Sequence, residues 1–245
     1  MYDNYIFDLY GTLVDIHTNE SKASLWKYMA GYMTLQGASY SAAELRKRYR
    51  SLISDLCRKQ YEKNKSLIPE LTPDQIEVDL SQVFSRLYQE KGVEQTPQML
   101  ADFALLFRAV SLHYFRLYEG AELLLKELHR QGKRIYLLSN AQRLFTEPEL
   151  RSLGIYDLFD DVMISSDIGF KKPSPLFYGA LLEKHGLDPK VSVMIGNDWQ
   201  ADAWGAHNSG LASMYIHTAQ SPEIAGGLPR DCRRLETISD VLQQN

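Results

Sequence analysis

The chain has 245 residues, 44% of them hydrophobic and 24% charged, which is the composition of a globular protein with a sizeable core. This composition excludes a disordered tail, a collagen-like fibre and a low-complexity scaffold. The 27 basic and 31 acidic residues leave a formal charge of −4, and no apolar stretch reaches the roughly 18 residues that cross a bilayer. We therefore expect neither nucleic acid nor a membrane among its partners.

The cysteines and the first residues of the chain indicate its compartment. Cys57 and Cys232 are too few and too far apart in the sequence to form a disulfide framework or, by themselves, a metal site. The N-terminal residues show neither the basic segment nor the apolar segment of an export signal. We therefore expect a cytoplasmic protein. The oligomeric state is not indicated by any pattern.

Short apolar runs mark the predicted strands, beginning with residues 4–9. Similar runs rich in Ile, Val, Leu, Met and Tyr follow late in the chain, at residues 134–139, 161–165, 191–195 and 212–216. Helical patterns, such as residues 176–185, separate most of these runs. Short strands that alternate with helices predict a parallel sheet covered on both faces, which is a Rossmann-like three-layer α/β fold.

The middle of the chain contains no convincing strand. It shows instead helical patterns at residues 20–36, 41–65, 73–91 and 97–118. We therefore predict two domains, an α/β core of residues 1–15 and 119–245 and an inserted α-helical cap domain of residues 16–118. Because the insertion follows the first strand, the cap is expected over the carboxyl ends of the strands, where open α/β sheets bind ligands.

Polar side chains follow the predicted strands, which places them at that ligand-binding edge. They comprise a carboxylate on a tight turn, hydroxyl and amide donors, a lysine at a helix start and an acidic cluster. In chain order these residues are Asp8 with Gly11 and Thr12, Ser139 with Asn140, Lys172, and Asn197 with Asp198 and Asp202. The residue preferences of tight turns do not by themselves explain why polar groups of these kinds follow four successive strands.

This ordered set resembles the motifs of the haloacid dehalogenase superfamily of hydrolases, in the subgroup with a helical cap between its first and second motifs. The resemblance covers nearly the whole chain. Each motif is short, and their order and spacing carry the resemblance. The matching segments are Phe7–Leu13 (FDLYGTL), Leu137–Asn140 (LLSN), Lys172–Pro175 (KPSP) and Ile195–Asp202 (IGNDWQAD).

The resemblance implies a chemical role for each residue of the set. Asp8 would attack the substrate and form an aspartyl intermediate, which divides one difficult displacement into two. Thr12 and Ser139 would hydrogen-bond the transferring group, and Lys172 would offset the negative charges that meet there. Gly11 and Asn140 are expected to contact the substrate, a small and anionic molecule.

The resemblance also implies Mg²⁺, which prefers oxygen ligands from carboxylates, water and phosphate. Asp8, the main-chain carbonyl of Tyr10 and Asp198 would be its protein ligands. Asn197 is an alternative ligand, because the family's acidic residue falls at either position of this pair. Asp202, one helical turn later, would orient water, Lys172 or the surroundings of the metal.

Tyr10 departs from the phosphatase pattern of this family. Phosphatases usually carry a second Asp there as general acid and base, whereas a phenol, with a reference pKa near 10, is a poor base at neutral pH. About 10²–10⁴-fold of general acid–base assistance would be missing. The 2-haloacid dehalogenases of the family carry Tyr in the same frame; they release halide, which needs no proton, and use no metal. Tyr10 is thus a catalytic candidate whose role depends on the reaction.

Asp198 favours the phosphatase, because a carboxylate near Asp8 repels it unless a cation intervenes. A dehalogenase would need an arginine on the first part of the cap to receive halide. Arg46, Arg48 and Arg50 are the candidates, with a solvated helix face as the alternative interpretation. We therefore predict a hydrolase with an aspartyl nucleophile, a Mg²⁺-dependent phosphatase of a small phosphorylated metabolite. The alternatives are a metal-independent 2-haloacid dehalogenase and a catalytically weak binding module.

Overall fold

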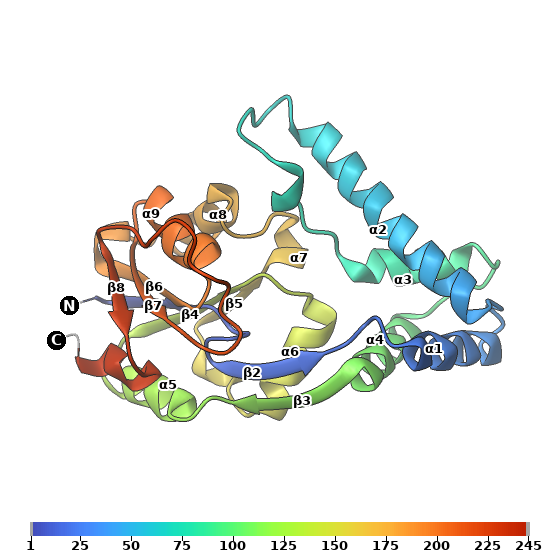
Figure 1. The fold of residues 1–245 in the computed structure, drawn as a ribbon, viewed down its shortest axis with the longest axis horizontal. Coiled ribbons are helices and arrows are strands. Elements are labelled where there is room, and N and C mark those ends of the chain that lie inside the picture. The colour runs from blue at the N-terminus through green and yellow to red at the C-terminus, as the bar shows by residue number, and fades with distance from the viewer. Residues whose placement is uncertain (1, 244–245) are drawn as a thin grey trace.

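A six-stranded parallel sheet lies at the centre of the computed structural model, which describes residues 2–243 (Figure 1). The strands stand in the spatial order β5-β4-β1-β6-β7-β8, so the first strand of the chain is central. The predicted strands are confirmed, and β8 is an addition whose sequence, CRRL, has no apolar run. The bounds are β1 Asn4–Phe7, β4 Arg134–Ser139, β5 Asp161–Ile164, β6 Ser192–Gly196, β7 Ala212–Ile216 and β8 Cys232–Leu235.

Alternation of side chains along the strands gives the sheet two apolar faces. Tyr5 and Phe7 of β1 face one layer of helices, whereas Ile6 faces the other. This three-layer arrangement confirms the predicted Rossmann-like α/β fold. The first layer holds α5 (Ala121–Arg130), α6 (Arg143–Ser152) and a 3₁₀-helix (Ile238–Gln243), and the second holds α8 (Pro175–His185) and α9 (Gly205–Asn208). Shorter elements are α7 (Ser165–Ile168), 3₁₀-helices at Tyr156–Leu158 and Pro189–Val191, and a π-helix, η4 (Trp199–Trp204).

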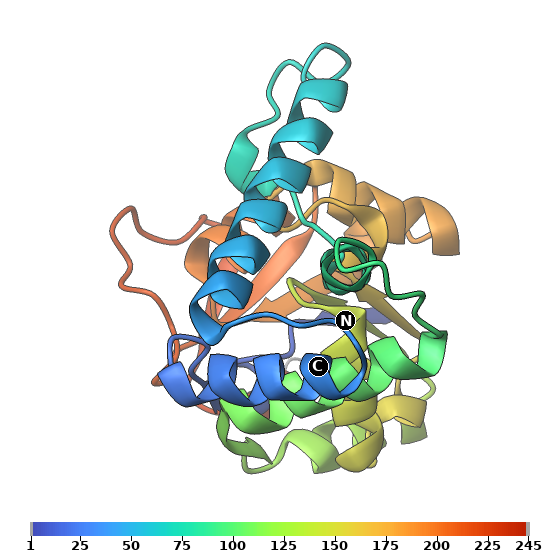
Figure 2. The same cartoon turned by 90° about the vertical axis from the view of Figure 1, so that its right-hand side faces the viewer.

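Four further helices build a separate apolar core beside the sheet, and we call them the cap (Figure 2). Aromatic rings dominate this core: the ring of Phe84 packs against those of Tyr49, Phe103 and Phe107, at centroid distances from 4.8 to 6.1 Å. Phe145 of α6 stacks on Phe107 and so joins the cap to the layers around the sheet. The cap helices are α1 (Ala23–Leu35), α2 (Ala42–Asn64), α3 (Leu80–Gln89) and α4 (Pro97–Ser111), with a 3₁₀-helix at Pro73–Gln75.

A two-stranded antiparallel ribbon joins the cap to the sheet, which corrects the prediction that residues 16–118 contain no strand (Figure 1). β2 (Val14–Thr18) pairs with β3 (Leu112–Leu117), so the fourth helix ends at Ser111 and not at Tyr118. Tyr114 stands at a helical interval from Val110, and only pairing with a strand about a hundred residues earlier turns this segment into β3. The proposed domain boundaries, after residues 15 and 118, fall inside β2 and just beyond β3.

The predicted helix of residues 73–91 is also interrupted. It divides into the 3₁₀-helix at Pro73–Gln75 and α3, and residues 76–79 between them are not helical. Ile76 instead forms an antiparallel bridge with Phe170, which belongs to the loop before Lys172. A tertiary contact therefore overrides the local helical pattern at this point.

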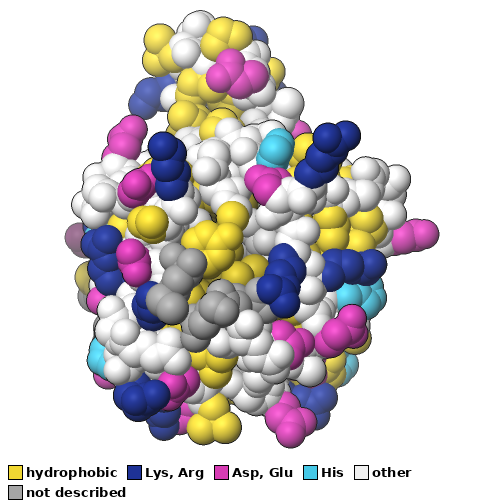
Figure 3. All heavy atoms as spheres, turned by 90° about the vertical axis from the view of Figure 1, so that its left-hand side faces the viewer, with side chains coloured by type: hydrophobic (Ala, Val, Ile, Leu, Met, Phe, Trp, Pro, Cys, Tyr) yellow, Lys and Arg dark blue, Asp and Glu magenta, His cyan; other side chains and the backbone are white. Residues whose placement is uncertain are grey.

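The two ends of the described chain lie on the side of the sheet opposite the cap (Figure 1). On that face, basic and acidic side chains are interspersed rather than gathered by sign (Figure 3). Every helix within residues 2–243 is too short or too polar to span a bilayer. The face in Figure 3 thus agrees with the small net charge of the sequence.

The aromatic core of the cap generates a stability prediction. Phe84→Ala removes a ring that is fully buried, and we expect it to lower the free energy of unfolding by about 3–5 kcal/mol. Urea titration followed by circular dichroism measures this change. Leu35→Ala, at a side chain that is 89% exposed, is the control and should change stability by less than about 0.5 kcal/mol. Equal effects of the two substitutions would show that the ring does not support the cap.

Candidate active site

The carboxyl ends of the central strands bring the predicted residues together around one pocket of about 160 Å³, which we call the Asp8 pocket. Asp8 follows β1, Ser139 ends β4 and Asn197 follows β6, while Lys172 comes from the loop after α7. Of the residues in the four predicted motifs that were assigned a role, Gly11 and Thr12 lie outside the described lining. The lining consists of Asp8, Tyr10, Ser139, Asn140, Lys172, Asn197, Asp198, Ala201, Asp202, Gln220 and Pro222.

The ammonium of Lys172 joins two carboxylates in a buried cluster. Its Nζ lies 2.8 Å from Oδ1 of Asp8 and 2.7 Å from Oδ1 of Asp202, and the exposed fractions of the three side chains are 1%, 11% and 3%. Burial alone would lower the pKa of the lysine, but Asp202 and Asp8 raise it above its usual range, which keeps the ammonium charged. Burial raises the pKa of Asp202. One cation thus faces two acidic groups.

A glycine and a wide helical turn make room for Asp202. A Cβ atom at Gly196 would lie 2.1 Å from Oδ2 of Asp202, so a larger residue cannot stand at the end of β6 without moving that carboxylate. The backbone N–H of Asp198 donates to the same oxygen at 2.9 Å. Asp202 itself lies in the π-helix η4, a rare conformation that often occurs at functional sites. These constraints hold its other oxygen against Lys172.

A tight turn supports the other oxygen of Asp8. The Oγ1 of Thr12 lies 3.2 Å from Oδ2 of Asp8 and 3.2 Å from Oδ1 of Asn197, and Thr12 is fully buried. Gly11 adopts a φ of +87°, and a Cβ there would lie 2.3 Å from the amide of Asn197. The described contacts therefore give Gly11 and Thr12 a part in shaping the turn around Asp8.

The two residues at the end of β4 differ in what they bind. The Oγ of Ser139 is buried and has no hydrogen-bond partner among residues 2–243. Such a group costs about 1–3 kcal/mol, and it indicates a place where a ligand atom completes the hydrogen bond. The side chain of Asn140 instead exchanges two hydrogen bonds with the main chain of Lys172, at 2.9 and 2.8 Å. Asn140 therefore positions the lysine backbone.

The hydroxyl of Tyr10 binds α6. It lies 3.0 Å from Oγ1 of Thr146 and donates to Oε2 of Glu149. Nε of Arg108, on α4, donates to the other oxygen of Glu149 at 2.5 Å. Burial, together with the charge of Glu149, raises the pKa of Tyr10 well above its usual range. Its phenol is therefore engaged elsewhere and poorly suited to proton transfer near neutral pH.

Oxygen atoms suited to a cation come from Asp8 and Asp198. Oδ1 of Asp198 accepts two backbone hydrogen bonds at 2.9 Å from the next helical turn, which leaves lone pairs on Oδ2. Two neighbouring hydroxyls occupy the amide of Asn197, at 3.2 and 3.4 Å. The structure shows no metal-suited group of three His, Cys, Asp or Glu within residues 2–243. Because Mg²⁺ commonly uses one or two carboxylates with water and phosphate, the Asp8 pocket fits it.

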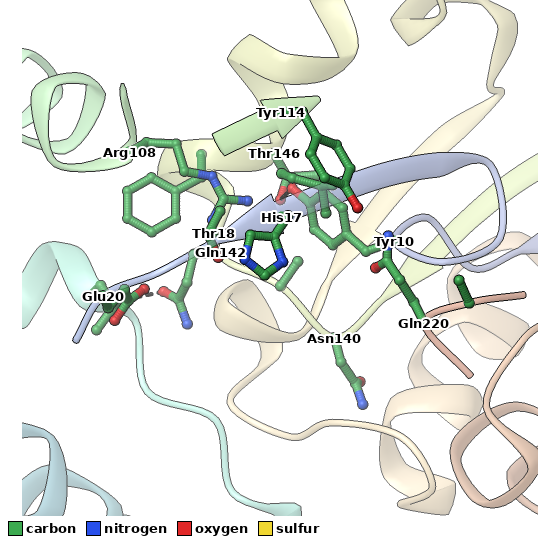
Figure 4. A pocket seen from close by; sticks show the side chains of 15 residues that line it. Tyr10, His17, Thr18, Glu20, Arg108, Tyr114, Asn140, Gln142, Thr146 and Gln220 are labelled. Carbon is green, nitrogen blue, oxygen red and sulfur yellow. Dashed lines mark hydrogen bonds between the residues drawn. The ribbon is translucent and has the colours of Figure 1, made fainter. Parts of the chain in front are cut away.

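A larger cavity of about 610 Å³, which we call the cap cavity, adjoins the Asp8 pocket and shares Tyr10, Asn140 and Gln220 with it. Figure 4 shows how side chains from the ribbon, from α4 and from α6 surround this space. Its lining consists of Tyr10, Ile16, His17, Thr18, Glu20, Leu80, Arg108, Tyr114, Asn140, Ala141, Gln142, Phe145, Thr146, Ala219 and Gln220. A ligand can therefore extend from Asp8 into the space below the cap.

The arginine of the cap cavity is Arg108 and not one of the predicted candidates. Nε of Arg48 donates to the two oxygens of Glu90 within the cap, at 2.9 and 2.8 Å. Arg46, Arg48 and Arg50 line neither the cap cavity nor the Asp8 pocket. Sequence reasoning missed Arg108 because it stands in a long helix whose packing, rather than its pattern, brings one polar side chain to the cavity.

The cap also contacts the lysine loop, by which we mean residues 169–172. The N–H of Glu77 donates to the carbonyl of Gly169 and the N–H of Lys171 donates to the carbonyl of Gln75, both at 2.9 Å. Nε2 of Gln60, on α2, donates to the same Gly169 carbonyl at 2.7 Å. These bonds end at the residue before Lys172, so the loop that carries the lysine is held from the cap side as well.

Known proteins match this chain over most of its length. Glyceraldehyde 3-phosphate phosphatase of Methanothermobacter thermautotrophicus is 26% identical over 150 residues, which cover 61% of this chain and 66% of that protein. YfnB of Bacillus subtilis is 24% identical over 246 residues, 98% of this chain and 95% of YfnB. This chain spans less than two thirds of the length of the first phosphatases that it matches.

Solved structures share the fold. The crystal structure of YfnB with bound magnesium superposes with a TM-score of 0.56 at 19% identity, covering 99% of this chain and 97% of that one. A 2-haloacid dehalogenase from Pseudomonas syringae pv. Tomato superposes with a TM-score of 0.66 at 16% identity, with coverages of 99% and 97%. At these identities the likeness concerns the fold alone.

The family comparison is more specific. The sequence model of the haloacid dehalogenase-like hydrolases matches residues 2–210, a stretch that contains all of the residues around the Asp8 pocket except Gln220 and Pro222. The resemblance expected from the four motifs is thereby confirmed. The chain belongs to the haloacid dehalogenase-like hydrolase family.

Proposed function

We propose that this protein is a Mg²⁺-dependent phosphatase that transfers the phosphoryl group of a small metabolite to water through Asp8. The observation that carries the proposal is the charge of the Asp8 pocket. Three acidic side chains, Asp8, Asp198 and Asp202, line this pocket. Lys172, the one lysine or arginine among the described lining residues, contacts two of them, Asp8 and Asp202. An anionic phosphate cannot approach this arrangement unless a further cation offsets the excess negative charge. The phosphatase names of several relatives support the same reading.

Asp8 acts as the nucleophile in this proposal. One of its oxygens forms a bond to phosphorus while the bond from phosphorus to the leaving-group oxygen breaks, which gives an aspartyl phosphate. Water then attacks phosphorus, the bond to Asp8 breaks, and inorganic phosphate leaves with the carboxylate restored. Lys172 and Thr12 hold the two carboxylate oxygens, so Asp8 keeps one orientation through both steps. Such preorganisation is the main electrostatic means by which enzymes lower barriers.

The remaining residues hold the transferring group and the cation. The unpartnered Oγ of Ser139 would donate to a phosphoryl oxygen, and Asn140 would keep Lys172 in place beside it. Asp8, the main-chain carbonyl of Tyr10 and Asp198 would hold Mg²⁺, whose charge neutralises phosphate oxygens when it is bound. Asp198 is preferred to Asn197, because hydroxyl groups already occupy the amide. Asp202 acts through Lys172, which it contacts directly.

A 2-haloacid dehalogenase is the second candidate, and Tyr10 is the observation that favours it. In that reaction Asp8 attacks carbon, halide leaves without a proton, and no metal takes part. Asp198 opposes this candidate, since an uncompensated carboxylate in the Asp8 pocket repels a haloacid. Arg108 opposes this candidate too, because an arginine that is already paired with Glu149 is not free to receive halide.

The central prediction concerns phosphate release. We expect the purified protein to release phosphate from members of a panel of phosphorylated metabolites and aryl phosphates, provided that Mg²⁺ is present. Asp8→Asn removes the nucleophile and should abolish release. Malachite green detection of inorganic phosphate, with and without EDTA, measures both effects. Silence across the panel, together with halide release from 2-haloacids, would replace the phosphatase with the dehalogenase.

The assignment of Asp198 generates a second prediction. Asp198→Asn should weaken Mg²⁺ binding by at least about 10–100-fold, because even groups that only support metal ligands contribute this much. Isothermal titration calorimetry of Mg²⁺ with the protein provides a readout that does not depend on turnover. The matched control is Asp157→Asn, the same change at an exposed site outside the pocket. Unchanged affinity in Asp198→Asn would remove Asp198 from the metal site.

Tyr10 generates a third prediction, about leaving groups. Because its phenol is bound to α6, the protein lacks the usual proton donor, and we expect 4-nitrophenyl phosphate to exceed a simple alkyl phosphate by about 10²–10⁴-fold in kcat/KM. Tyr10→Phe should leave this ratio unchanged, since it removes only the engaged hydroxyl. Equal turnover of alkyl and aryl phosphates would show that a proton donor is present, and a ratio that rises in Tyr10→Phe would identify Tyr10 as that donor.

A further inference from the structure

We infer that the substrate is a phosphate monoester of an uncharged, ring-bearing alcohol or phenol, and that the cap cavity disfavours leaving groups that carry a carboxylate or a second phosphate. This inference rests on the proposed function, because it assigns the leaving group of a phosphatase. It concerns the cap cavity and not the Asp8 pocket, so its failure can be told apart from failure of the phosphatase proposal.

The division of the site into two spaces is the first step. The Asp8 pocket, of about 160 Å³, contains the residues that would handle a phosphoryl group. The cap cavity, of about 610 Å³, meets it at Tyr10, Asn140 and Gln220. A phosphoryl group at Asp8 therefore directs the rest of the substrate into the larger space. The lining of that space then decides which leaving groups are accepted.

The charges of that lining are the second step. Arg108 is the one lysine or arginine among the described lining residues, and Glu149 accepts from its Nε and Nη2 at 2.5 and 3.4 Å. Both side chains are mostly buried, with exposed fractions of 15% and 10%. Glu20 lines the same cavity and adds a second carboxyl group, which Tyr49 hydrogen-bonds. In either protonation state of Glu20, these groups sum to no positive charge.

The consequence for a charged leaving group follows from desolvation. A carboxylate that enters the cap cavity gives up part of its hydration and meets no unbalanced lysine or arginine among the described lining residues. Glu20, which lines the cavity, adds repulsion when its carboxyl group is ionised. An uncharged leaving group avoids both costs. The lining thus discriminates by charge, in the sense opposite to a site built for dicarboxylate-like or bisphosphate substrates.

The walls of the cavity suit a ring. The imidazole of His17 stacks on the ring of Tyr114, with centroids 5.8 Å apart and planes at 24°. Figure 4 shows these two rings on the ribbon side of the space and the ring of Tyr10 near them. Thr18 and Gln220 add hydroxyl and amide groups to the lining of the cavity. Aromatic faces together with neutral hydrogen-bonding groups are what a sugar, a nucleoside or a phenol would use.

A matched pair of substrates tests the charge rule. 4-Carbamoylphenyl phosphate and 4-carboxyphenyl phosphate have nearly the same shape, and only the second carries a negative charge on its leaving group. Both are aryl phosphates, so neither depends on a proton donor. We expect kcat/KM for the amide to exceed that for the acid by about tenfold or more, with Mg²⁺ at pH 8.

Isosteric variants test the residues. Glu20→Gln removes one carboxylate and should reduce the ratio of kcat/KM for the amide to kcat/KM for the acid several-fold. Glu149→Gln should reduce the same ratio, because it leaves the charge of Arg108 unbalanced. Glu94→Gln is the matched control: it makes the same chemical change at an exposed cap residue outside the cavity, and it should leave the ratio unchanged. Thermal unfolding by circular dichroism establishes that each variant is folded.

The outcomes separate the two proposals. Equal or faster turnover of the carboxylated substrate by the unmodified protein would overturn this inference while leaving the phosphatase in place. A ratio that does not change in folded Glu20→Gln and Glu149→Gln would overturn it too, since the named charges would not be its cause. Absence of phosphate release from both compounds would overturn the inference, and absence of release from the whole panel of phosphorylated compounds as well would overturn the proposed function.

Discussion

The contact of one buried ammonium with two carboxylates is the constraint around which the site is organised. A charge of this kind is costly to remove from water, and it is tolerated only where its partners are fixed at hydrogen-bond distance. Lys172 meets this condition with Asp8, which follows β1, and with Asp202, which lies in the π-helix η4 after β6. The supports around them, Thr12 on one side and Asn140 on the other, serve the same geometry.

The cap takes part in this geometry. Its main chain is hydrogen-bonded to Gly169 and Lys171, immediately before Lys172, while Asn140 holds the lysine itself from the core. The lysine loop is therefore pinned between two bodies with separate apolar cores. Tyr10 forms a second link, because its hydroxyl reaches the ion pair that Glu149 makes with Arg108 of the cap. The cap therefore both bounds the cap cavity and holds the lysine loop beside the Asp8 pocket.

The features that depend on local sequence pattern were predicted correctly. Apolar runs marked the central strands, and the polar residues that follow them meet at one edge because parallel strands end together. The ribbon of β2 and β3 was not predicted, because only pairing across about a hundred residues makes the segment around Tyr114 a strand and not a helix. The hydrogen-bond partners of Tyr10 were not predicted for a similar reason. Its partners Thr146 and Glu149 lie on α6, and no spacing in the sequence links them to the first motif.

Arg108 shows the same limit of prediction from the sequence. The arginines at 46, 48 and 50 were candidates because they lie on the first part of the cap, but this position in the sequence does not indicate which of them faces the cavity. Packing of α4 against α6 decides the matter and brings Arg108 to Glu149. Residue types at strand ends could thus be assigned before the structure, whereas the residues that bound the cap cavity could not.

Gly196 has a consequence for how this chain can vary. A side chain there would occupy the space of Asp202, and displacing Asp202 would free Lys172 from one of its two partners. A substitution at the end of β6 would therefore disturb the contact between Lys172 and Asp8 without any direct contact with Asp8. Positions 196 and 202 are therefore coupled through space: a side chain larger than glycine at 196 is compatible only with a displaced or smaller residue at 202, and thus with a different means of holding the lysine.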